Sequence, residues 1–178
     1  MFYTIICVIT IIAFILLIVA LYYNKFQFTI IKIEEAESNT EIYLNKKVEL
    51  LNRLIPIVKS KIKDKKLLNK IDVDELNHFE LNKKLSHEAN NIYTILDDEE
   101  KLLKIDKIVN LIEEINDNEE DLIASIKYYN DTVVDFNKLI LSFPSNIIRL
   151  FFGYKKKEFY SNEKREMFEI LREEKKED

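Results

Sequence analysis

An apolar stripe with heptad spacing lies within residues 119–154 and constrains the fold more than any other feature. Its members recur in alternating steps of four and three residues: Leu122, Ile126, Tyr129, Val133, Phe136, Ile140 and Phe143. This spacing keeps one face of a helix against a partner helix. Pro144 disfavours helical geometry at the residue before it, so we expect the helix to end at Phe143.

The scarcity of turn-forming residues extends this helical prediction to the whole chain. Among 178 residues there are one glycine and two prolines, whereas sheets and tight turns use more of both. The net charge of −5 argues against a nucleic-acid partner, because nucleic-acid binders present a basic face. The single cysteine, Cys7, excludes an intramolecular disulfide. We therefore expect an all-α protein.

The first 24 residues carry no charged side chain, and residues 2–23 are almost wholly apolar. At about 1.5 Å per residue, a helix of this length crosses the ~30 Å hydrocarbon layer of a membrane. Tyr22 and Tyr23 end the run, as interfacial aromatic residues do. A cleaved signal peptide is the alternative, but the run lacks a basic start and an Ala-x-Ala site. We predict an uncleaved anchor that contacts the lipid bilayer through residues 2–23.

Charges beside the anchor indicate its orientation. Lys25 and Lys32 follow the apolar run, whereas only the terminal amine precedes it. The positive-inside rule then favours an outside N-terminus and a cytoplasmic domain. We expect a single-pass protein of the cell membrane.

Apolar stripes predict three further helices, at residues 44–62, 76–96 and 102–115, the last with Leu102, Ile105, Val109, Ile112 and Ile115 as its stripe. Polar sequences typical of helix starts separate the helices, at residues 72–75, 97–100 and 116–119. Pro56 lies inside the first stripe, where we expect a kink. The predicted fold is an N-terminal transmembrane helix followed by an antiparallel up-down bundle of about four long helices. The predicted parts are an anchor (1–24), a bundle (25–160) and a charged tail (161–178).

The sequence contains no complete metal or catalytic motif. Glu75-x-x-His78 matches half of a di-iron carboxylate motif, but His87 is not preceded by a glutamate at that spacing. No Gly-x-Ser-x-Gly, no cysteine outside the anchor and no glycine-rich loop is present. We therefore predict no catalytic residue, no metal and no cofactor.

Two asparagines and an aromatic run are the candidate interaction residues. Asn130 and Asn137 each follow an aromatic residue of the stripe. Each amide could fix the register of the bundle, or hold a loop or a partner backbone. The aromatic run at residues 151–154 could close the end of the bundle. Alternatively, with the lysines at residues 155–157, it could contact a bilayer or a partner.

These residues form a pattern that resembles the C-terminal signature of the LemA family. The signature covers Tyr-Asn, a later Asn, Phe-Pro and an aromatic-Gly-aromatic turn; its matching residues are Tyr129, Asn130, Asn137, Phe143, Pro144, Phe152, Gly153 and Tyr154. Nearer the N-terminus, Leu54, Ile55 and Pro56 match the family's Leu-Ile-Pro. The family's usual Tyr-Pro-Leu element is missing from the middle of the chain, and Ile126 and Lys127 stand where an arginine usually precedes Tyr-Asn. The chain is therefore similar to a divergent member.

The resemblance implies a bacterial-type protein with one N-terminal transmembrane helix, an outside N-terminus and a cytoplasmic helical bundle. It implies no enzymatic activity, because the family has no established biochemical role. The first hypothesis is a protein-interaction or scaffolding module at the bacterial inner membrane that binds other proteins or itself. The alternatives are a bundle that binds a small molecule or metal, and a sensor of lipid surfaces that uses residues 151–157.

Overall fold

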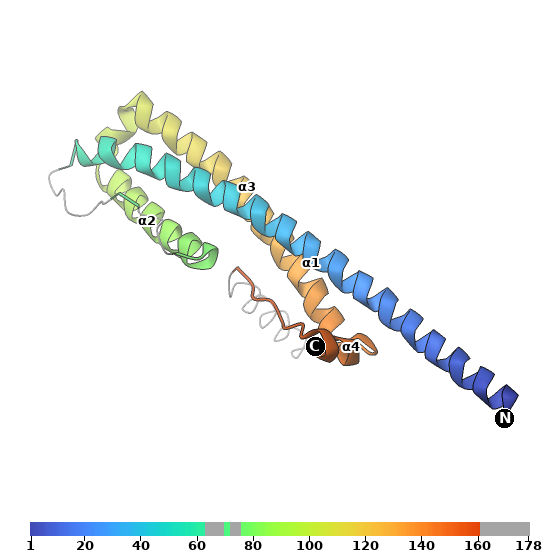
Figure 1. Ribbon diagram of the computed structural model, residues 1–178. Coiled ribbons are helices and arrows are strands. Elements are labelled where there is room, and N and C mark those ends of the chain that lie inside the picture. The colour runs from blue at the N-terminus through green and yellow to red at the C-terminus, as the bar shows by residue number, and fades with distance from the viewer. Residues whose placement is uncertain (63–69, 72–75, 161–178) are drawn as a thin grey trace, which may run out of the picture. The chain divides into compact units, whose positions relative to one another are not determined.

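The computed structural model describes residues 1–62, 70–71 and 76–160, which contain helices and no strand (Figure 1). The helices are α1 (Phe2–Lys59), α2 (His78–Asp98), α3 (Asp106–Leu141) and α4 (Ser145–Phe152), with a 3-10 helix, η1 (Glu100–Lys104), between α2 and α3. The predicted all-α fold is confirmed. The apolar start of α1 is long enough to cross a membrane, which fits membrane anchoring.

The chain forms two compact units. The anchor unit comprises Met1–Glu37 and Tyr128–Phe159, and the α2 unit comprises Ser38–Lys127 with Tyr160. Both α1 and α3 continue from one unit into the other, so each unit is built on one segment of each helix.

In the anchor unit, α1 and α3 pack through the predicted heptad stripe. Tyr129, Val133, Phe136 and Ile140 are buried on α3, and Phe26 and Ile33 are buried on α1. The rings of Phe26 and Phe136 meet edge to face with their centres 6.1 Å apart. Including Phe143 in this stripe was wrong, because 78% of its surface is exposed. The reason is that α3 ends at Leu141, so the helical period does not extend to Phe143.

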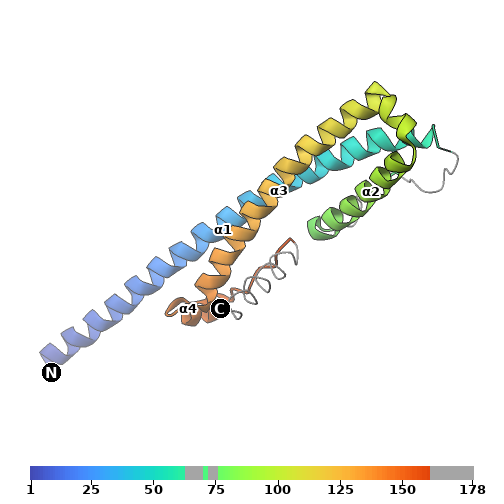
Figure 2. The same cartoon turned by 180° about the vertical axis from the view of Figure 1, so that it is seen from behind.

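In the α2 unit, α2 lies beside α1 and α3 in both views of the ribbon (Figures 1 and 2). The buried face of α2 consists of Leu81, Leu85, Ala89, Ile92 and Leu96. This face confirms most of the predicted second stripe. A capping box fixes the start of α2, because the Glu80 N–H donates to the Asn77 side chain and the Asn77 N–H donates to the Glu80 carboxylate. The helix start predicted at residues 72–75 lies outside the described residues, as does the tail at 161–178.

The helix start predicted at residues 116–119 was wrong, because these residues lie inside the 36-residue α3. The predicted third and fourth helices therefore form one helix. Tertiary contacts compensate for the poor helix propensity of asparagine and aspartate in this stretch. The buried Asn118 side chain donates to the backbone oxygen of Tyr43, 3.1 Å away, and Glu119 pairs with Lys47.

The helix start predicted at residues 97–100 was also wrong, since α2 ends at Asp98 and α3 begins at Asp106. The predicted stripe was only partly correct: Leu102 and Ile115 are buried, but Ile105, Val109 and Ile112 are half-buried, and Ile108 and Leu111 are buried instead. The difference arises because the predicted stripe began at Leu102 with α-helical spacing. Leu102 lies in η1, where a turn takes about 3.0 residues rather than 3.6. Pro56, where a kink was predicted, lies inside α1, and the helix continues past it to Lys59.

Candidate functional site

The residues of the C-terminal signature gather in the anchor unit, where α3 is followed by a turn, α4 and an extended segment. The Phe143–Pro144 peptide bond is cis. Ser145 is buried, and its hydroxyl donates to the backbone oxygens of Leu139 and Ser142. This hydroxyl therefore ties the first residue of α4 to the last turn of α3.

Gly153 ends α4 in the left-handed region, with φ 71°. Its N–H donates to the backbone oxygen of Arg149, as in a helix C-cap. Glycine adopts this conformation without the steric cost that other residues incur. The aromatic-Gly-aromatic signature is therefore a helix stop that changes the direction of the chain between Phe152 and Tyr154.

The two aromatic residues that flank Gly153 pack on α1. Phe152 lies against Tyr23, with ring centres 5.0 Å apart, and Tyr154 lies against Phe26 at 4.6 Å. The Gln27 amide donates to the Tyr154 hydroxyl oxygen at 2.9 Å. The signature turn is thereby attached to the part of α1 that directly follows the apolar run.

Asn137 and Tyr129 on α3 hold the extended segment that follows Tyr154. The Asn137 side chain forms two hydrogen bonds with the backbone of Lys157, and the Tyr129 hydroxyl donates to the backbone oxygen of Glu158 at 3.3 Å. Asn137 therefore holds a loop, which is one of the two roles predicted for the asparagines. Asn130, seven residues earlier, is buried on α3.

Burial of Tyr129 has an electrostatic consequence. Desolvation, followed by the nearby carboxylates of Glu37 and Glu158, raises the pKa of the Tyr129 phenol to about 12. Each of these effects disfavours the phenolate. Tyr129 therefore acts as a neutral hydrogen-bond donor at physiological pH.

A groove of about 550 Å³ lies between α1 and α3 in the anchor unit. Its charged and aromatic lining comes from both helices: Tyr22, Lys25, Phe28 and Lys32 on α1, and Tyr128, Asp131, Asp135 and Lys138 on α3. The Lys32 ammonium lies 4.7 Å from the centre of the Phe28 ring, and Lys138 is 4.0 Å from Asp135. We call this feature the basal groove.

In the sequence, Lys25 and Lys32 indicated only the orientation of the anchor, and no local motif pointed to the basal groove. A spacing of seven residues places both lysines on one face of α1. Asp131, Asp135 and Lys138 likewise recur at helical spacing on α3. That shared periodicity was the available signal, but only packing of the two helices brings the two faces together.

The N-terminal part of the signature has a structural role in the α2 unit. Leu54 and Ile55 are buried in its core, whereas Pro56 is exposed. Asn52 was not among the predicted residues. Its amide donates to the backbone oxygen of Ile71 at 3.2 Å and accepts from the Ile71 N–H at 2.8 Å. The α2 unit thus contains the same two-bond asparagine arrangement as the anchor unit.

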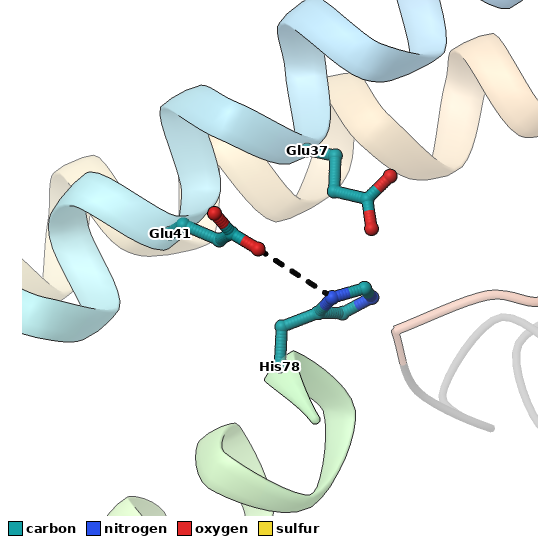
Figure 3. A group of neighbouring side chains, drawn as sticks. All are labelled: Glu37, Glu41 and His78. Atoms are coloured by element: carbon teal, nitrogen blue, oxygen red, sulfur yellow. Dashed lines mark ion pairs between the residues drawn. The ribbon is translucent and has the colours of Figure 1, made fainter. Parts of the chain in front are cut away.

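His78, at the start of α2, lies near a carboxylate of α1. Figure 3 shows its imidazole facing Glu41, and Nδ1 is 3.8 Å from a carboxylate oxygen. The His78 side chain is only 16% exposed and packs against the rings of Phe79 and Tyr160. Glu75, its partner in the half motif, lies outside the described residues. Within the α2 unit, Glu41 and His78 are placed to form an ion pair when the histidine is protonated.

Comparison with known proteins supports the signature. Neither the curated proteins nor the solved structures gave a match to this chain. The model of the LemA family, in contrast, matches residues 36–170, which is more than half of the chain. This range includes Leu54, Tyr129 and Gly153, whose structural roles are described above. The chain therefore belongs to the LemA family.

Proposed function

We propose that this protein is a membrane-anchored scaffold that binds a partner protein, or a second copy of itself, in the basal groove. It acts by holding that partner at the membrane surface and is not an enzyme. The observation that carries the proposal is the groove itself, which opens directly after the apolar run of α1.

The lining of the basal groove combines exposed aromatic residues with charged residues of both signs. Phe28 and Tyr128 are exposed there, and aromatic residues supply much of the energy of protein interfaces. Three lysines and two aspartates accompany them, as charged rims accompany apolar centres. The mixture of charges favours a partner segment that also carries both signs.

The charges beside the anchor support a cytoplasmic position for the groove. Lys25 and Lys32 both line it and directly follow the apolar run. The positive-inside rule places such lysines in the cytoplasm, with the N-terminus outside. The proposed site is therefore the cytoplasmic face of the cell membrane.

Site-specific photocrosslinking in native membranes tests the proposal. A benzophenone amino acid replaces Tyr128 in the full-length protein, and the matched control replaces Tyr93, a half-buried tyrosine on α2. We expect a discrete crosslinked product from position 128 that is absent or much weaker from position 93. Coexpression of copies with two different tags shows whether the captured chain is a second copy.

Charge reversal gives the complementary test. The double variant Asp131→Lys, Asp135→Lys changes only exposed side chains of the groove. We expect it to reduce the product from position 128 while leaving the helical circular dichroism unchanged. Equal products from positions 128 and 93, or a product that resists charge reversal, would reject the basal groove as a docking site.

A further inference from the structure

The short helix α4 and the turn before it present large apolar side chains that the protein does not cover. Exposure is 78% for Phe143, 49% for Ile147, 71% for Leu150 and 83% for Phe151. Covering such side chains is favourable, because it removes apolar surface from water. Contiguous exposed apolar surface of this kind marks a site that contacts another apolar phase.

The position of α4 against α1 indicates that this apolar phase is the hydrocarbon layer of a membrane. A groove of about 470 Å³ is lined only by apolar side chains, among them Ile15, Ile18 and Val19 of α1 and Ile147 and Phe151 of α4. The three α1 residues belong to the apolar run that ends at Tyr23. They precede Tyr23 by four to eight residues, which corresponds to about 6–12 Å along a helix. Each half of the hydrocarbon layer is about 15 Å thick, so α4 lies at a depth that falls within one leaflet.

The interfacial and polar residues around α4 fit a position of this helix within one leaflet. Phe152 lies against Tyr23, whose position at the end of the apolar run suits the membrane interface. After the Gly153 turn, residues 155–157 are three exposed lysines, and clustered lysines suit the phosphates of a membrane surface. On α4 itself, Asn146 and Arg149 are half-buried and sit to one side of the exposed apolar face.

We propose that α4, together with Phe143, is inserted in the same leaflet that α1 enters, with lipid acyl chains filling the groove between the two helices. The protein then contacts the bilayer through two elements, a spanning helix and a short helix confined to one leaflet. The second contact fixes the anchor unit at a defined height, because α4 is joined to α3 through Ser145 and to α1 through Phe152 and Tyr154.

This inference rests on the membrane anchor of the proposed function, so the test measures the membrane contact of α1 and that of α4 separately. An environment-sensitive fluorophore is attached to single cysteines of the full-length chain in vesicles, and brominated acyl chains serve as the quencher. The native Cys7 reports on the apolar run of α1. In a Cys7→Ser background, Leu150→Cys reports on α4. The control is Ile42→Cys, another exposed apolar position, in the α2 unit, with 60% exposure against 71% for Leu150.

We expect brominated lipid to quench the label at Leu150 to an extent comparable with Cys7, and to leave the label at Ile42 unchanged. Quenching at Cys7 without quenching at Leu150 would overturn the inference and retain the anchor. A Leu150 label shielded from aqueous iodide but insensitive to brominated lipid would also overturn it, since another protein chain would then cover α4. Absence of quenching at Cys7 would overturn the anchor and the inference together. Phe151→Cys repeats the measurement if Leu150→Cys disturbs folding.

Discussion

Asn137 pairs with the backbone of Lys157 as a neighbouring strand would. Its amide nitrogen donates to the Lys157 oxygen at 2.9 Å, and its amide oxygen accepts from the Lys157 N–H at 3.0 Å. Lys157 lies in a segment without helical hydrogen bonds, so its backbone groups need partners from elsewhere. The Asn137 side chain thus makes the two hydrogen bonds that the Lys157 backbone would otherwise make within a helix or sheet.

Replacement of Asn137 by alanine is expected to release this segment. Two neutral hydrogen bonds contribute about 1–3 kcal/mol to the free energy of unfolding. The variant should melt earlier and be cleaved by trypsin faster at the lysines of residues 155–157. Asn90→Ala, an exposed position on α2, is the control and should change neither property. Unchanged tryptic cleavage in Asn137→Ala would contradict the role of these two bonds.

Replacement of Gly153 by alanine is expected to destabilise the anchor unit by about 1 kcal/mol. The cause is the backbone alone, because φ is 71° and a Cβ at this position would meet no atom within 4 Å. Asparagine tolerates the left-handed region better than alanine does. Thermal unfolding should therefore rank the variants glycine, asparagine, alanine in decreasing stability. An alanine variant as stable as the wild type would show that α4 ends differently.

The raised pKa of Tyr129 predicts a loss of stability in alkali. Below pH 10 the phenol is protonated in the folded and unfolded states, so its contribution is fully present. Between pH 10 and about 12 the unfolded state loses the proton first, which favours unfolding. The stability advantage of the wild type over Tyr129→Phe should therefore shrink over that range. Denaturant titrations at several pH values measure it.

Tyr128→Phe provides the comparison for this titration, because Tyr128 is adjacent in sequence but exposed. Its stability difference from the wild type should stay small at every pH. An advantage over Tyr129→Phe that is constant from pH 9 to pH 12 would argue against a phenol held neutral by burial and by the carboxylates of Glu37 and Glu158.

The ion pair between Lys47 and Glu119 predicts asymmetric effects of its two partners. The Lys47 side chain is only 3% exposed, whereas that of Glu119 is 37% exposed. Glu119→Gln leaves a buried ammonium without its counter-charge and should cost about 1–3 kcal/mol, less than for a fully buried pair. Lys47→Met removes the buried charge and should be close to neutral. Urea unfolding distinguishes these outcomes, and equal losses in both variants would contradict this account.

Several features followed from the sequence because they depend on local periodicity and composition. The apolar run at residues 2–23, the heptad stripe from Leu122 to Ile140 and the end of α3 before Pro144 need no knowledge of distant residues. Gly153 was likewise recognisable as part of a turn, since few other residues tolerate its backbone conformation. Short-range patterns of this kind determine the all-α class, the buried faces of the helices and the family signature.

Tertiary contacts decided the features that local patterns predicted wrongly. Residues 116–119 have the composition of a helix start, yet Asn118 and Glu119 find partners on α1 and remain inside a continuous helix. The basal groove, the bonds of Asn137 to Lys157 and the groove between α4 and the anchor join segments far apart in the chain. The sequence determines which faces are apolar or charged, but only packing determines which faces meet. For that reason the sequence by itself indicated an all-α member of the family with an apolar N-terminal helix, whereas the tertiary structure brought together the two grooves that we propose as its contact surfaces.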